Sequence, residues 1–495
     1  MQRRIVLAVI LLAAVIVVAR FAVVAREFDT VVAAGAFDAA RDNHTELRAF
    51  LRRMPKGGDL HTHLSGAVYA ERFIAWAAQQ NLCADPENVL LSKPRCDNPG
   101  DVSAADAMHD QKLYDQLVNA FSTRSFVPTV AVPSDHDKFF AAFDKFGAAS
   151  GSRFVDMTID QLKQYDSENV QYVEFMASFA CWNDRDKFIK AMAEQADDRG
   201  RLVALRANGL DDCVTAKRND LVTSIGKIRS ELGCDQQATR PGCRVTFRYI
   251  AQILRNTSPD DVFLQTAVAA ALIRAEPQVV ALNLVQSEDN LIARSDYTRH
   301  MEIVAFLASD VPVALHAGEL WLGDVPPPDL TFHIRQAVEI AHARRIGHGV
   351  ALAFEHDMDG LLAVMRTRPV VVEINLSSNN IILGVRGKNH PLATYLAAGV
   401  PVVLSTDDAG VSRINMTNEY FRAVHDQGLD YPILKRAQRV DPFLSRRDAK
   451  AQRTGALRSL LHRVRAIGGA AAVGAAEPDR ADQGCGCPVL NCGVA

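Results

Sequence analysis

The sequence lacks an excess of charge of either sign. It has 495 residues, with 55 Lys and Arg against 58 Asp and Glu, which gives a formal net charge of -3 at pH 7. So small a net charge supplies no field that would gather nucleic acid or an anionic membrane surface. We therefore expect no nucleic-acid partner, and a small molecule is the expected ligand.

The chain also lacks any apparent internal repeat. What it does have is apolar material, with 48% hydrophobic and 23% charged residues. This composition is typical of a globular protein, and the chain is long enough to bury a large core as one big domain or two smaller ones.

The first 25 residues have the layout of an export signal. Arg3 and Arg4 precede an unbroken apolar run over residues 5–19, and a second short run ends at Ala25. A basic start, an apolar middle and a small-residue exit are typical of a secretory signal peptide. If it is not cleaved, the segment 5–25 reaches the roughly 20 residues that a membrane anchor needs. We expect an exported protein, periplasmic or secreted, that meets a membrane only through an uncleaved leader.

Cysteine usage also fits an oxidising compartment. Two pairs lie close in sequence among Pro, Gly, Asp and Asn residues: Cys83 with Cys96, and Cys234 with Cys243. They predict two surface loops closed by disulfides, with free thiols as the alternative. Because there are nine cysteines, at least one stays unpaired within the chain.

The C-terminal segment 461–495 is rich in Ala and Gly, and we expect it to be a disordered tail. Three cysteines lie in it: Cys485, Cys487 and Cys492. Their spacing resembles that of metal ligands, but three thiolates without a fourth ligand indicate zinc only weakly.

Eight apolar, β-branched runs are typical of buried parallel strands. They cover residues 59–63, 170–176, 245–253, 279–284, 311–316, 346–348, 370–374 and 402–405. Amphipathic helical stretches lie between them, for example at 331–343 and 391–398. Alternation of strand and helix eight times predicts an α/β protein with a (β/α)8 TIM barrel.

Two segments stand outside this alternation. Residues 26–54 predict an N-terminal helical extension, with a helix over 37–54 that ends in Met-Pro-Lys-Gly-Gly. Residues 82–145 are too long for an ordinary connection and predict an inserted helical subdomain over the barrel mouth, with helices around 104–121 and 136–146. The barrel itself is expected over residues 55–460.

Reactive side chains follow the predicted strands at the ends that share one face of a barrel. His61 and His63 end the first strand, His316 the fifth and His348 the sixth, and Asp407 with Asp408 follows the eighth. Alternation along a strand points His61 and His63 the same way, as two ligands of one metal require. Three imidazoles and one carboxylate suit a zinc-like ion that leaves one position for an acidified water. Glu319, three residues beyond His316, would then lie close enough to pass a proton to a substrate.

These residues belong to segments that resemble the four signature blocks of the adenosine deaminase family of metal-dependent amidohydrolases. The segments cover residues 54–67, 316–319, 345–349 and 405–408, and the resemblance extends over about 54–424. It implies hydrolysis of adenosine, with 2′-deoxyadenosine as a further substrate, to inosine and ammonia. The export signal and the long insert resemble the secreted, growth-factor-type branch, whose members dimerise, so a homodimer is a further implication.

The same resemblance implies a role for each residue. One Zn²⁺ per chain would be held by His61, His63, His316 and Asp407. Glu319 would protonate purine N1, His348 would orient the attacking water or take its proton, and Asp408 would hold N7. Other amidohydrolases of this barrel type use two metals bridged by a carboxylated lysine, but residues 282–286 at the end of the fourth strand contain no lysine, which favours one metal.

Two positions depart from the family pattern. Ser65 stands where an acidic residue commonly contacts the ribose 5′-hydroxyl, and Gln286 stands where a glycine normally offers its backbone N–H to purine N3. These differences leave open a different or modified aminopurine nucleoside as the substrate. A secreted signalling or binding factor with a secondary deaminase site is a further alternative.

Overall fold

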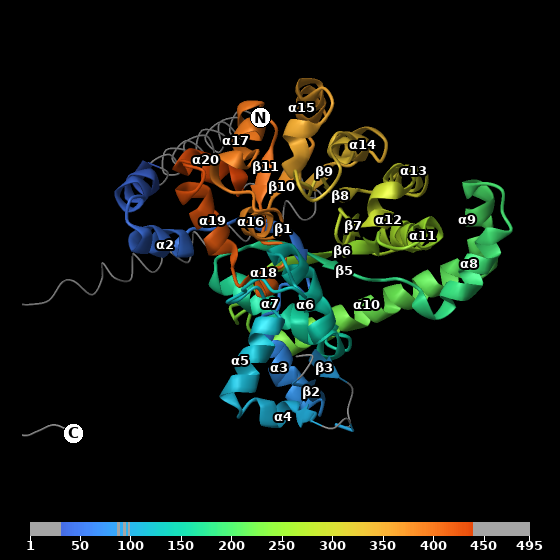
Figure 1. Ribbon diagram of the computed structural model, residues 1–495, viewed down its shortest axis with the longest axis horizontal. Helices are drawn as coiled ribbons and strands as arrows, with labels where there is room; N and C mark the ends of the chain where they lie inside the picture. Colours follow the sequence, from blue (N-terminus) through green and yellow to red (C-terminus); the bar gives the residue numbers. More distant parts are fainter. Residues whose placement is uncertain (1–30, 87–89, 93–95, 98–99, 439–495) are drawn as a thin grey trace, which may run out of the picture.

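The computed structural model describes residues 31–86, 90–92, 96–97 and 100–438 (Figure 1). Eight parallel strands form two four-stranded sheets, in the orders β1-β5-β6-β7 and β8-β9-β10-β11. They are β1 (Gly58–His63), β5 (Tyr172–Ala177), β6 (Thr246–Leu254), β7 (Val279–Val285), β8 (Ala314–Ala317), β9 (Arg345–His348), β10 (Val371–Ile374) and β11 (Val402–Leu404). All eight predicted strands are confirmed.

The two sheets are joined at both edges by isolated parallel bridges. Leu282 pairs with Val313 between β7 and β8, and Thr62 pairs with Asp407 between β1 and the end of β11. At the second seam the backbone N–H of Asp407 donates to the carbonyl of His61 at 2.9 Å. The cyclic strand order is that of a (β/α)8 barrel, and the predicted fold class is confirmed.

Side chains fill the barrel rather than leaving a pore. One cluster of buried side chains comes from strands that meet at the β1–β11 seam: Leu60, Tyr172, Val371 and Val403. A second cluster comes from β5 to β8: Met176, Ile250, Ala281, Val285 and Ala314. Both faces of each strand are therefore covered, which explains why the strands are continuous apolar runs in the sequence.

Helices surround the sheets (Figure 1) and include the long α10, which packs along α7 and α11. Their bounds are α7 (Phe154–Ser167), α8 (Arg185–Ala193), α9 (Asp198–Ala207), α10 (Leu210–Leu232), α11 (Pro259–Ala275), α12 (Leu291–Ser295), α13 (Tyr297–Leu307), α14 (His333–Glu339), α15 (Met358–Thr367), α16 (Leu376–Leu383), α17 (Leu392–Ala397), α18 (Ala409–Ser412), α19 (Met416–His425) and α20 (Tyr431–Ala437). The helix predicted at 331–343 is shorter than expected, because Phe332 has a non-helical φ of -147° before its start and His342 takes a positive φ of 55° beyond its end.

Capping residues divide two further helical stretches, and the single helix predicted over 37–54 is therefore wrong in length. The N-terminal extension is helical at 31–40 and again in α2 (His44–Arg53), where Asn43 accepts hydrogen bonds from the first-turn N–H groups. The stretch around 104–121 forms α4 (Ala104–Ala107) and α5 (Gln111–Ala120), because Asp110 caps a new helix. Side chains of this type satisfy N–H groups that a helix start leaves without partners.

The insert also contains a small antiparallel sheet that the sequence analysis missed. Its strands are β2 (Cys83–Asp85), β3 (Leu90–Ser92) and β4 (Val102–Ser103), in the order β3-β2-β4. The longest insert helix, α6 (Asp135–Ser150), packs on α3 (Ala70–Gln79), where Phe146 stacks on Phe73 with ring centroids 4.4 Å apart. The insert is thereby fixed on α3, the helix that follows β1.

The described residues form three disulfides. Cys83–Cys96 and Cys234–Cys243 were predicted, whereas Cys181–Cys213, which ties the segment after β5 to α10, was not. The predicted leader 1–25 and the tail 461–495 with its three cysteines lie outside the described residues. Within the described part of the chain, no helix has both the length and the apolar character needed to cross a membrane.

Candidate metal centre and active site

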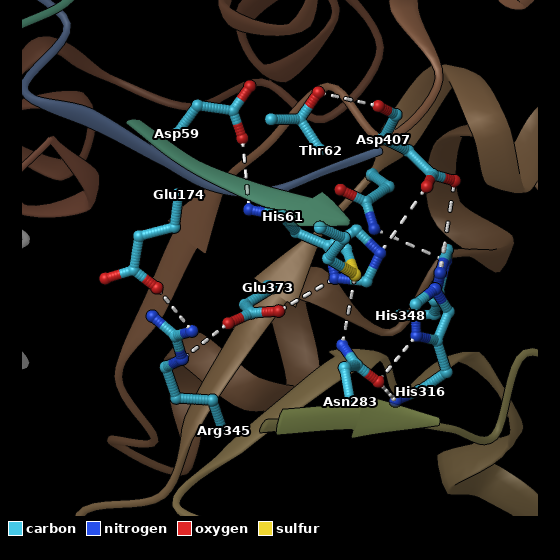
Figure 2. A network of polar contacts seen from close by, with 12 residues as sticks. Asp59, His61, Thr62, Glu174, Asn283, His316, Arg345, His348, Glu373 and Asp407 are labelled. Carbon is cyan, nitrogen blue, oxygen red and sulfur yellow. Dashed lines mark hydrogen bonds and ion pairs between the residues drawn. The ribbon is translucent and has the colours of Figure 1, made fainter. Parts of the chain in front are cut away.

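The four predicted metal ligands meet at the carboxyl ends of β1, β8 and β11. Figure 2 shows three of them, His61, His316 and Asp407. One donor atom of each of His61, His63, His316 and Asp407 lies within 4.8 Å of the others. Nε2 of His61 and Nε2 of His63 are each 3.4 Å from Oδ1 of Asp407. The ligand side chains are buried, except that His63 is 14% exposed.

This donor set fits a divalent cation. Nε2 of His61 and Oδ1 of Asp407 are buried without a hydrogen-bond partner, which is costly unless another group binds them. Burial lowers the pKa of His61, but the carboxylates of Asp407 and Glu373 raise it to about 10, so the site stabilises positive charge. Imidazole nitrogen and carboxylate oxygen are the donors that zinc-type ions accept.

Side chains behind the ligands fix the orientation of two rings. Nδ1 of His61 donates to Glu373 at 2.8 Å, and Nδ1 of His316 donates to Asn283 at 2.8 Å, so both rings present Nε2 to the site. Arg345 holds the second oxygen of Glu373 at 2.9 Å and is itself held by Glu174 at 2.6 Å (Figure 2). Such outer contacts set the tautomer of a ligating histidine.

The sequence analysis missed Glu373 and Asn283. Each interrupts the apolar run of a buried strand, and a polar residue at such a place was the signal that could have found it.

Three predicted site residues have a strained backbone. Gln286, His348 and Asp407 follow or end β7, β9 and β11 with φ values of 81°, 68° and 58°. The left-handed region is unfavourable for residues other than glycine, at a cost of roughly 1–3 kcal/mol each, and such residues concentrate at functional sites. The strain therefore gathers on the face of the barrel that holds the metal donors.

Glu319 and His348 lie next to each other beside the metal donors. Oε1 of Glu319 is 3.4 Å from Nδ1 of His348, and Nε2 of His348 is 4.0 Å from Asp407. The backbone N–H of Glu319 donates to Glu288 at 2.7 Å, so this buried carboxylate, also missed in the sequence analysis, positions the Glu319 loop. Burial, reinforced by the charge of Asp407, raises the pKa of Glu319 well above its usual value. Glu319 can therefore carry a proton.

Asp408 lies next to the metal donors with its Oδ1 buried and without a partner. A side-chain carbon at Gly66 would overlap the Asp408 carboxylate, so only glycine leaves room for it there. Burial and the neighbouring charge of Asp407 raise the pKa of Asp408 well above its usual value. Its carboxyl group is available to a ligand as a proton donor.

The two positions that depart from the family pattern lie at the edge of this site. Ser65 is half-buried in the turn after β1, between His63 and Gly66. The exposed side chain of Gln286 accepts a hydrogen bond from the backbone N–H of Asn256 at 3.0 Å. Gln286 therefore directs its side chain to the neighbouring loop after β6.

A cavity of about 340 Å³ lies between the start of α6, the end of α16 and the loops after β7 and β8. Its lining is Ser134, Asp135, His136, Asp289, Asp324, Asn380, Ile381, Ile382, Leu383 and Gly384. The insert takes part, because Nε2 of His136 on α6 is 3.2 Å from Asp289. Asp289 directly follows Glu288 in the chain, so the cavity adjoins the segment that positions Glu319.

A family model for adenosine deaminase matches residues 224–453. The chain is 29% identical over 199 residues to an adenine deaminase of Rhizobium meliloti, which covers 40% of this chain and 56% of the relative. It is 30% identical over 142 residues to an adenosine deaminase of Clostridium acetobutylicum, covering 28% and 39%. The match thus spans about half the length of these two relatives. With adenosine deaminase 2 of Pongo abelii the identity is 24% over 384 residues, covering 73% of this chain and 67% of the relative.

Solved structures show the same fold. The N6-mAMP deaminase of Arabidopsis has a TM-score of 0.52 at 18% identity, covering 82% of this chain and 98% of that chain. A zinc-bound amidohydrolase of Burkholderia ambifaria has a TM-score of 0.50 at 17% identity, covering 85% and 95%.

Proposed function

Because the chain belongs to the adenosine deaminase family, we propose that it is a hydrolase that converts adenosine and 2′-deoxyadenosine to the inosine products and ammonia. The observation that carries this proposal is the convergence of three histidines and Asp407 with Glu319, His348 and Asp408 at one end of the barrel. These groups come from separate strand ends, and packing alone does not require them to meet.

We propose that His61, His63, His316 and Asp407 hold one zinc ion per chain. The buried donor atoms without partners support this, as does the bound zinc of the Burkholderia amidohydrolase with the same fold. When bound, the metal supplies a water acidic enough to attack near neutral pH.

The chain's own residues then act on the purine ring. Glu319, protonated in its buried setting, donates to N1 and makes C6 more electrophilic. Asp408 donates its proton in a hydrogen bond to N7, which is an acceptor. Water adds to C6, and one of its two protons replaces the proton that Glu319 gave to N1 while the other passes to the amino nitrogen. The bond from C6 to that nitrogen then breaks, ammonia leaves, and C6 keeps the oxygen as a carbonyl. General acid catalysis of this kind typically contributes about 10²–10⁴-fold.

The acidic cavity supports an unphosphorylated substrate. Its lining contains Asp135, Asp289 and Asp324 and, among the described residues, no lysine or arginine. A phosphate group there would meet like charge without a basic partner. The Arabidopsis N6-mAMP deaminase acts on a nucleotide by its name, and we propose a nucleoside for this chain. Position 65 has a serine and no acidic side chain. This difference favours a second candidate substrate, an aminopurine nucleoside other than adenosine.

We also propose that the protein is exported. The three disulfides support an oxidising compartment, because such bonds are rare in reducing cytosol.

A substrate panel on metal-depleted protein reloaded with zinc tests the function. Adenosine, 2′-deoxyadenosine, N6-methyladenosine, adenine and AMP are compared by ammonia release. We expect the first two to be fastest and AMP to be at least about 10-fold slower. Absence of turnover on every compound, or about two zinc ions per chain, would contradict the proposal.

A further inference from the structure

Two residues outside the four signature segments support the ring of His348. Asn379 contacts the ring, and His390 contacts Asn379. Nδ2 of Asn379, on α16, is 2.8 Å from Nδ1 of His348, and Oδ1 of the same amide is 3.0 Å from Nε2 of His390. The backbone N–H of Leu392 is 3.1 Å from Nδ1 of His390. The three contacts form a continuous path from the start of α17 to the catalytic ring.

The direction of every hydrogen bond in this path follows from its first member. A backbone N–H can only donate, so Nδ1 of His390 accepts from Leu392 and the proton of the neutral His390 ring is on Nε2. Nε2 of His390 therefore donates to Oδ1 of Asn379, and the amide must turn its NH₂ group to His348. Nδ1 of His348 then accepts, which leaves the proton of this ring on Nε2.

Burial makes the path stable. Asn379 is 0% exposed and His390 2%, so water cannot replace either contact. Burial, together with the charge of Arg422, lowers the pKa of His390 to about 3 and keeps its ring neutral. The amide nitrogen of Asn375 also lies 3.4 Å from Nδ1 of His348.

The other side of the ring faces the site. Nε2 of His348 is buried without a hydrogen-bond partner, 4.0 Å from Oδ2 of Asp407. Glu319 lies on the Nδ1 side, with its Oε1 at 3.4 Å. The N–H group at Nε2 can therefore donate a hydrogen bond to a molecule bound between His348 and the metal donors.

We propose that Asn379 and His390 are positioning residues that lock His348 in the tautomer with its proton on Nε2. His348 then donates a hydrogen bond to the attacking water and does not take its proton, a consequence that rests on the proposed function. The proton of the attacking water goes instead to Glu319, which has become a carboxylate after protonating N1. Of the two roles that the family resemblance leaves open for His348, the contacts select orientation of the water.

The tautomer is measured directly by two-bond ¹H–¹⁵N correlation spectra of protein labelled with ¹⁵N-histidine. The signals of His348 are assigned from their loss in His348→Gln. A protonated Nε2 and an unprotonated Nδ1 in the wild-type protein support the proposal, and a protonated Nδ1 overturns it. This readout needs no turnover, so the tautomer stands even if no purine is a substrate, in which case the proposed function alone fails.

Two pairs of variants test the path. Asn379→Asp offers His348 only acceptors, so it should move the proton to Nδ1 and lower kcat by at least about 10²-fold, with KM and zinc content nearly unchanged. Asn389→Asp adds the same charge to an exposed neighbouring residue and should leave both the tautomer and kcat unchanged.

His390→Gln retains an acceptor and a donor and should keep most of kcat, whereas His390→Phe has neither and should lose it. Two outcomes would show that the hydrogen-bonded path does not set the tautomer of His348. One is an equal loss of activity in both His390 variants, and the other is an Asn379→Asp variant with the wild-type tautomer and kcat.

Discussion

Oε2 of Glu373 lies 2.8 Å from Nδ1 of His61, while Asp407 faces Nε2 of the same ring. The ring is thus held between a carboxylate behind it and a carboxylate within the donor set. Glu373→Gln removes the rear charge and weakens the hydrogen bond that fixes the tautomer. We expect zinc affinity to fall by about 10–100-fold, measured by competition with a chelator. Glu276→Gln, which changes a buried carboxyl group before β7, should leave affinity as it is.

Replacement of the proposed acid separates chemistry from metal binding. Glu319→Gln keeps the size of the side chain but has no proton of suitable acidity for N1. We expect zinc content to stay at one per chain while kcat falls by at least about 10²-fold, measured by metal analysis and ammonia release on the same sample. Loss of zinc together with activity would show that Glu319 supports the metal site instead.

Gly66 tests the placement of Asp408. A methyl group at Gly66→Ala would overlap the Asp408 carboxylate and push it from its position. We expect kcat/KM for adenosine to fall by at least about 10²-fold with zinc retained, because the displaced carboxyl no longer reaches N7. Gly226→Ala, in an exposed part of α10 with open space around the added carbon, should be neutral or slightly stabilising.

Burial of Glu419 should make stability depend on pH. Burial raises the pKa of this carboxyl from its ordinary value of 4.5 to about 7, so the folded state prefers the protonated form. Its contribution is fully present below about pH 4.5 and is lost as pH rises to about 7. Glu419→Gln stays neutral, so between pH 5 and pH 8 it should gain on the order of 2 kcal/mol relative to wild type in chemical denaturation. Exposed Glu194→Gln should show no such trend.

The disulfide Cys181–Cys213 should stabilise the protein more than Cys234–Cys243, which closes the shortest loop. Cys181–Cys213 spans a sequence separation of 32, against 9 for Cys234–Cys243. Loop-closure entropy assigns about 4 kcal/mol to the longer loop and about 3 kcal/mol to the shorter. Replacing both members of each pair by alanine should therefore lower the thermal midpoint more for the first pair. An equal or reversed order would mean that strain or residual structure outweighs the loop term.

Much of the fold could be predicted because parallel strands buried on both faces are continuous apolar runs. Once eight such runs alternate with helices, the barrel brings their carboxyl ends together, and this is why His61, His316 and Asp407 could be grouped from sequence. The breaks before His44 and Gln111 were also within reach, since Asn43 and Asp110 are ordinary helix caps.

The supporting residues could not be predicted in the same way. The roles of Glu373 and Asn283 depend on which histidine lies opposite each across the barrel. Asn379 and His390 meet through an irregular segment with no periodicity, and the pairing of Cys181 with Cys213 depends on how α10 folds back along the barrel. In each case the deciding contact is a tertiary one.

The seam at which Thr62 meets Asp407 joins residues 345 positions apart. During synthesis on the ribosome, His61 and His63 emerge early, but the carboxylate that completes the donor set arrives only with the last strand. A chain stopped before β11 would lack Asp407 and therefore one of the four proposed metal ligands. On the proposed function, the full set of metal ligands therefore forms only once the last strand of the barrel pairs with the first.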